Sequence, residues 1–177
     1  MGWQKLTTLS ALLSLNLLTA CSTLHTTPTA NLDKKAQWAL LPAINNTETP
    51  QAGARLDSIT ASLLRVHGVQ NVAYIGANTT ANEVLFELAD RRQQNAALAT
   101  AKTTGAKYAV ATSVDEWRYK VGLDGEPAAG ITLNIIDLQS EQVVWSGTAA
   151  KTGWSREAVS AVAQKVVDDL LKSAVNP

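Results

Sequence analysis

Apolar and polar positions predict alternating strands and helices from residue 37 onward. An apolar run in residues 37–47 predicts a strand that leads into a proline and an Asn-Asn-Thr turn. A helix is expected next, closed by Gly68, because apolar residues recur at helical spacing at Leu56, Ile59, Leu63 and Val66. The first pair of elements is therefore a strand followed by an amphipathic helix.

The same order repeats in the middle of the chain. Residues 69–76 predict a second strand, and the polar stretch after it leads to a helix that begins near Leu85 or Asp90 and ends before Gly105. Larger and small side chains alternate in residues 107–120, which predicts a third strand. We expect its small face to lie against a helix layer; that face comprises Ala109, Ala111 and Ser113.

The C-terminal third predicts an antiparallel hairpin followed by a helix. Two β-rich runs, residues 131–138 and 143–150, are separated by the sequence QSEQ. We expect Ser155 to cap a final helix with Glu157 in its first turn and a stripe of Val159, Val162, Val166 and Leu170. The order βαβαβββα predicts an α/β fold, a three-layer-like sandwich with a mixed sheet of about five strands and about three helices.

The N-terminal segment has a different pattern. Lys5 precedes a short apolar run over residues 6–18, which contains polar residues and falls short of the roughly 20 residues of a membrane-spanning helix. Small residues lead into Cys21, the only cysteine of the chain. We therefore expect residues 1–20 to be a secretory signal peptide that is cleaved before Cys21.

The sequence LTAC, which ends at Cys21, resembles the lipobox of bacterial lipoproteins. The resemblance implies that Cys21 becomes the first residue and carries acyl chains such as palmitate; the alternative is a plain secretory signal with a chance cysteine. Since Ser22 is not an aspartate, the resemblance also implies sorting to the periplasmic face of the outer membrane. We expect polar, threonine-rich residues 21–35 to be a tether and residues 36–177 a single domain.

Composition narrows the classes of function. Fifteen basic and fifteen acidic residues give a formal net charge of zero, which offers no electrostatic argument for binding nucleic acid. His25 and His67 lie far apart, and no cluster has metal-ligand spacing, so we expect neither metal nor cofactor. Asp124 and Glu126 resemble the paired carboxylates of a glycosidase, but they are two residues apart in a glycine-flanked loop, where we expect both to be solvated. Without a Gly-x-Ser-x-Gly or phosphate-binding motif, we expect no catalytic residue and no enzymatic activity.

Two segments combine aromatic and charged residues: DEWRYKVGLDGEP at residues 115–127 and KTGWSRE at residues 151–157. Trp154 follows a glycine in an expected strand-to-helix loop. In that position a tryptophan either covers the core or uses its amphipathic ring at a membrane interface or subunit contact.

The motifs EWRYK, DGEP and GWSRE, together with the hairpin, resemble the PelC family, the outer-membrane lipoproteins of Pel exopolysaccharide export. More loosely, LLPAINNT and GAKYAVATSV are similar to the periplasmic lipoproteins of the curli-secretion and penicillin-binding-protein-activator group. The first resemblance implies a non-enzymatic homo-oligomeric ring of roughly a dozen subunits beneath the outer membrane. The resemblance further implies that this ring guides a cationic exopolysaccharide to the outer-membrane β-barrel porin of the export complex.

The resemblance also implies roles for individual residues. Trp154 and Arg156 are expected at or near the membrane, and Trp117, Arg118 and Tyr119 at a subunit interface. The acidic surface that guides the polymer is expected to include Asp115, Glu116, Asp124 and Glu126, each of which has an ordinary solvated acid as its alternative.

Two rival functions follow from the same features. A periplasmic tethered binding module that activates a cell-wall synthase needs a tether of some tens of residues, longer than residues 21–35. A secretion pore needs membrane strands of about 9 to 11 alternating residues, whereas residues 131–138 have the pattern of a core strand.

Overall fold

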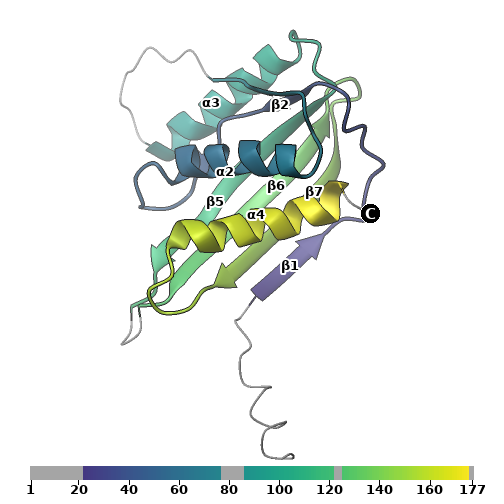
Figure 1. Cartoon of the computed structure of the whole chain (residues 1–177). Coiled ribbons are helices and arrows are strands. Elements are labelled where there is room, and N and C mark those ends of the chain that lie inside the picture. Colours follow the sequence, from purple (N-terminus) through teal and green to yellow (C-terminus); the bar gives the residue numbers. More distant parts are fainter. Residues whose placement is uncertain (1–21, 77–85, 122–124, 176–177) are drawn as a thin grey trace, which may run out of the picture.

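The computed structural model describes residues 22–76, 86–121 and 125–175 (Figure 1). Its strands are β1 (Ser22–Thr26), β2 (Trp38–Leu40), β3 (Ile44–Asn45), β4 (Val72–Tyr74), β5 (Tyr108–Tyr119), β6 (Pro127–Asp137) and β7 (Gln142–Thr152). They form one mixed sheet in the order β1-β7-β6-β5-β2-β4, with β3 paired to β5. Strand β2 is parallel to β4 and β5, and β3 is parallel to β5, whereas the pairs β5–β6, β6–β7 and β7–β1 are antiparallel.

Three described helices cover the sheet: α2 (Ala52–Val66), α3 (Phe86–Ala101) and α4 (Val159–Val175). Helices α2 and α4 lie on one face and pack on a core that includes Trp38, Val110 and Leu133 (Figure 1). Helix α3 lies on the other face. The α/β sandwich expected from the sequence is therefore confirmed.

Helix α3 packs against small side chains of β5. Ala109 and Ala111 form a cluster with Ala97 and Ala101 of α3, as the alternation in residues 107–120 predicts. Short side chains on both elements allow the helix to lie close to the sheet.

Helix α2 buries a different face from the one expected. Ile59 and Leu63 are only half-buried and Val66 is 74% exposed. The buried positions are Ala52, Gly53, Leu56, Asp57, Thr60 and Leu64. The spacing predicted the helix correctly, but the inner face includes two polar residues that a purely apolar stripe omits.

The final helix begins later than expected. Helix α4 starts at Val159 and buries the predicted stripe, but Ser155 does not cap it and Glu157 precedes its first turn. Arg156 has φ 69°, a left-handed conformation that no α-helix contains, so the chain turns there before the helix starts.

The expected tether is folded onto the domain. Strand β1 pairs with the outer edge of β7, although all five of its residues are exposed. The segment after it is also attached, since Thr27 N–H donates to Ser146 O at 2.8 Å and Thr29 Oγ1 donates to Ser173 O at 3.0 Å. Residues 22–35 are therefore not a free tether. Among the described residues, no helix is both long and apolar enough to cross a bilayer.

Candidate functional site

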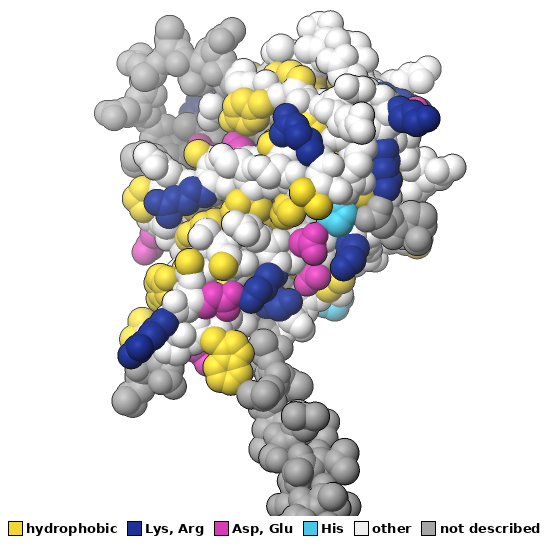
Figure 2. All heavy atoms as spheres, in the orientation of Figure 1, with side chains coloured by type: hydrophobic (Ala, Val, Ile, Leu, Met, Phe, Trp, Pro, Cys, Tyr) yellow, Lys and Arg dark blue, Asp and Glu magenta, His cyan; other side chains and the backbone are white. Residues whose placement is uncertain are grey.

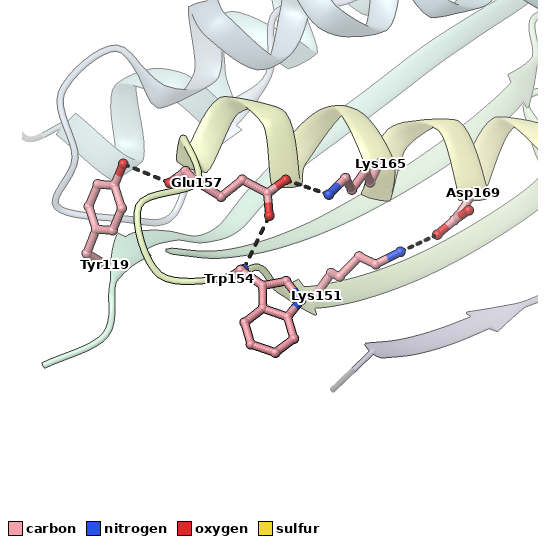
Figure 3. A network of polar contacts seen from close by, with 6 residues as sticks. All are labelled: Tyr119, Lys151, Trp154, Glu157, Lys165 and Asp169. Carbon is pink, nitrogen blue, oxygen red and sulfur yellow. Dashed lines mark hydrogen bonds and ion pairs between the residues drawn. The ribbon is translucent and has the colours of Figure 1, made fainter. Parts of the chain in front are cut away.

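The loop between β7 and α4 holds Trp154 away from the core. Its side chain is 63% exposed, and in Figure 3 the indole ring points away from both the helix and the sheet. A Cβ on Gly153 would lie 2.5 Å from both Glu157 Oε2 and Val162 Cγ2, so this close turn requires glycine. Trp154 therefore does not cover the core.

Glu157 fixes the shape of this loop (Figure 3). Its Oε2 accepts a hydrogen bond from Trp154 N–H at 3.3 Å, and its own N–H donates to Trp154 O at 2.9 Å. Tyr119 donates its hydroxyl to Glu157 O at 3.2 Å, and Lys165 donates to Glu157 Oε1. The lysine hydrogen bond lowers the pKa of Glu157, so its carboxylate stays charged and holds the loop at neutral pH.

The chain enters the domain at the same end of the sheet. Ser22 pairs with Lys151, three positions before Trp154, and Lys151 Nζ lies 3.4 Å from Asp169 Oδ2 of α4. Cys21 lies outside the described residues but is joined directly to Ser22. Ser22 therefore lies at the end of the sheet that carries Trp154.

We call this region the Trp154 end and define it by Ser22, Tyr119, Lys120, Lys151, Trp154 and Arg156. Arg156 is exposed, and Lys120 Nζ donates to Thr152 Oγ1 at 2.8 Å. An exposed indole beside cationic side chains suits an interface with anionic or zwitterionic headgroups.

Trp117 does not lie on the surface, contrary to the expected interface role. Its side chain is 4% exposed and belongs to the core. A β-bulge between Val114 and Glu116 shifts the alternation of β5 by one residue and turns Trp117 inward. Arg118, 2.9 Å from Glu116 Oε1, and Tyr119 are exposed and remain candidates for a subunit contact.

The acids expected to guide a polymer do not form one free cluster. Asp115 accepts hydrogen bonds from Asn46 Nδ2, Ser113 Oγ and Thr132 Oγ1 at 2.7–3.0 Å. Glu116 pairs with Arg118, Glu126 is exposed, and Asp124 lies outside the described residues. Over α2 and α4, acidic and basic side chains are interspersed (Figure 2).

The sequence analysis missed a buried carboxylate on α2. Asp57 is 8% exposed; its Oδ1 accepts from Ala43 N–H at 3.0 Å and its Oδ2 from the Tyr74 hydroxyl at 3.1 Å. Burial raises the pKa of Asp57 to about 6 and that of Tyr74 to about 12. Asp57 follows Leu56 in the sequence and lies on the same inner face of α2, so its position next to a core residue could have indicated its burial.

Asp57→Asn is expected to remove a pH dependence of stability. Because the pKa of Asp57 rises on folding from 3.8 to about 6, the folded state binds more protons between these values. The free energy of unfolding therefore rises as pH falls from 7 to 4, by up to about 3 kcal/mol from this group. Urea unfolding of both proteins at pH 7 and pH 4.5 measures the difference.

The lowered pKa values of Asp137 and Glu157 oppose this gain, because their stabilisation is lost as pH falls. Both groups are present in both proteins, so the difference between the two pH slopes isolates Asp57. Parallel slopes would show that the carboxyl does not change its pKa on folding.

Comparison with protein-family models and with curated protein sequences found no match. Among solved structures, the chain is similar to a PelC dodecamer from Paraburkholderia phytofirmans, with 35% identity over 87% of this chain and 99% of that one (TM-score 0.72). A dodecamer of a PelC variant from the same organism has 33% identity over 89% and 100% (TM-score 0.74).

A more distant structure has the same fold. Lipoprotein GNA1162 from Neisseria meningitidis is 17% identical over 77% of this chain and 96% of its own, with a TM-score of 0.54. That likeness concerns architecture alone, whereas the first two structures match this chain in sequence over almost their entire length. At 33–35% identity across 99–100% of those relatives, the chain belongs to the PelC family.

Proposed function

We propose that this protein is an outer-membrane lipoprotein that forms a closed ring and takes part in Pel exopolysaccharide export. In this proposal the ring guides a cationic polymer to an outer-membrane porin and performs no chemistry on it. The observation that carries the proposal is the family membership, since the two PelC relatives at 33–35% identity are dodecamers.

The Trp154 end supports a defined orientation on the membrane. A lipid on Cys21 would be joined directly to β1, and β1 enters the sheet opposite Lys151, close along β7 to the exposed Trp154. An acyl anchor and an interfacial indole at one end of the sheet would act on the same bilayer surface. The domain is then held against the membrane with this end towards the lipid.

The docked N-terminal segment disfavours the rival function of a tethered synthase activator. Beyond β1, Ala30, Leu32 and Ala36 pack against the main core, and Trp38 Nε1 donates to Asp33 O at 3.0 Å. A module that reaches across the periplasm needs a long free linker, which this segment does not supply while it is docked.

A formally neutral chain is compatible with guiding a cation. When acids gather on one concave surface of an assembly and bases lie elsewhere, the field acts on a passing polymer whatever the net charge. We propose that the guiding surface includes Asp115, Glu116, Asp124 and Glu126, of which Glu126 is exposed with no ion pair among the described residues.

The mass of the assembled protein tests the proposal. We expect the full mature chain, purified in detergent, to give a discrete species of about twelve copies by light scattering and native mass spectrometry. A head-to-tail interface between identical subunits gives a closed ring when its rotation closes, and a closed ring has a fixed number of copies. Arg118→Ala is expected to shift the mass to smaller species, with Arg91→Ala on α3 as the control. A strict monomer over a wide concentration range, with lipid present, would overturn the ring.

A further inference from the structure

The topology creates a binding crevice next to β2. This strand has a parallel neighbour on each side, and the chain reaches β4 through α2 on one face and β5 through α3 on the other. Such a point is where ligands bind in open α/β sheets, outside the carboxyl ends of the strands. A cavity of about 830 Å³ lies there, a size that holds small molecules.

Among the described residues, the lining of this cavity is acidic and includes no lysine or arginine. Asp57 reaches it from α2, Asp90 from α3 and Glu48 from the turn before α2. Within the part of the chain that the structure describes, no lysine or arginine forms an ion pair with any of these acids. Asp57 is nine-tenths buried and accepts one hydrogen bond on each oxygen from the described residues, so each oxygen has capacity for another.

The remaining lining favours an organic cation over a metal ion. No group of three or more potential metal ligands occurs in residues 22–76, 86–121 and 125–175. Amide side chains suited to hydroxyl groups also face the cavity, from Asn45, Asn46 and Gln93. Tyr74 is 55% exposed and offers a ring face, which attracts both an ammonium group and the apolar face of a ring.

We propose that this cavity binds a hexosamine unit of the exported polymer. Its protonated amine lies between the carboxylates of Asp57 and Asp90, and its hydroxyl groups bond to the amides of the lining. The inference takes its ligand from the proposed function and adds a discrete saccharide subsite to it. The lining includes none of the acids of residues 115–126 and no residue of the Trp154 end, although its Asn46 donates to Asp115 Oδ1.

Calorimetric titration of the full mature chain in detergent tests the subsite. The probes are a β-1,4-linked glucosamine trisaccharide and its fully N-acetylated counterpart, which lacks the positive charges. We expect the amine form to bind and the acetylated form to bind at least about tenfold more weakly, because hydrogen bonds to charged groups are the strong ones. Equal affinity for the two forms would overturn the proposal.

Substitutions in the lining test whether the trisaccharide binds in this cavity. Asp90→Asn keeps an oxygen that accepts from Asn45 N–H, a bond now 3.1 Å long to Oδ2, and is expected to weaken binding about tenfold. Glu48→Gln removes a charge from an exposed residue of the same lining, so it tests the cavity with little effect on the stability of the fold. Glu141→Gln, an exposed acid outside the cavity that pairs with Lys102, is the matched control. Unchanged affinity in both cavity variants would overturn the subsite.

This experiment separates the subsite from the ring. An assembly of about twelve copies that fails to bind the amine trisaccharide overturns the subsite and leaves the export proposal standing. A monomer that binds it overturns the ring and leaves the subsite.

Discussion

Replacing Cys21 with alanine is expected to move the protein almost completely from the membrane fraction to the soluble periplasmic fraction. Under the lipobox hypothesis this cysteine, the only one in the chain, carries the acyl chains. One acyl chain holds a protein only marginally, at about 0.8 kcal/mol per buried methylene, whereas several hold it stably. Removing the cysteine removes all of them at once. Cell fractionation followed by immunoblotting measures the change.

Ser22→Asp is the matched control for this experiment. It keeps Cys21 and therefore the lipid, but by the lipoprotein resemblance it should retain the protein in the inner membrane. Ser22 is exposed at the start of β1, so the change should cost the fold little. If Cys21→Ala protein stays in the membrane fraction after an alkaline wash, the lipid-anchor hypothesis is wrong.

Trp154→Ala is expected to weaken binding to phospholipid vesicles about thirtyfold when the protein carries no lipid. The estimate corresponds to losing the burial of one large side chain, about 2 kcal/mol. The measurement uses the Cys21→Ala protein as background, because a lipid anchor would mask the contribution of the indole. Since Trp154 is exposed, the free energy of unfolding should change by no more than about 0.5 kcal/mol.

Val143→Ala provides the control for the tryptophan. Val143 is also an exposed hydrophobic residue, 55% accessible, but it lies near the start of β7 while Trp154 follows its end. The valine variant should bind vesicles like its parent. Equal losses in the two variants would argue against insertion at the Trp154 end, and a large loss of stability in Trp154→Ala would place the ring in the core.

Hydrophobic periodicity predicted most of the fold because most elements bury a regular stripe of apolar side chains. The stripe of α4 and the small face of β5 are both where the sequence puts them. Strand β1 was not predicted, because its five residues are all exposed and it is defined by backbone pairing alone. The sequence of residues 22–26 carries no sign that the edge of β7 is open for pairing.

Site residues were harder to predict because single backbone irregularities decide which way they face. One extra residue in β5 turned Trp117 from the expected surface into the core. Asp57 lies on the inner face of α2, but hydrophobic periodicity does not mark a polar residue as buried. Its hydrogen-bond partners lie elsewhere in the sequence, in β4 and in the segment after β2. The exposure of Trp154 fits its loop position and depends on no such irregularity, whereas its role at the membrane stays a prediction.

The pairing of β1 with β7 leads us to expect a particular order of folding. Thr27 and Ser146, which bond just beyond the strand, are 119 residues apart in the chain. So distant a contact closes late, after local elements have formed and the loop between its ends has been ordered. We therefore expect the residues next to Cys21 to stay accessible to processing enzymes until the rest of the domain has folded. Under the lipobox hypothesis, lipid attachment would then precede the closing of the sheet.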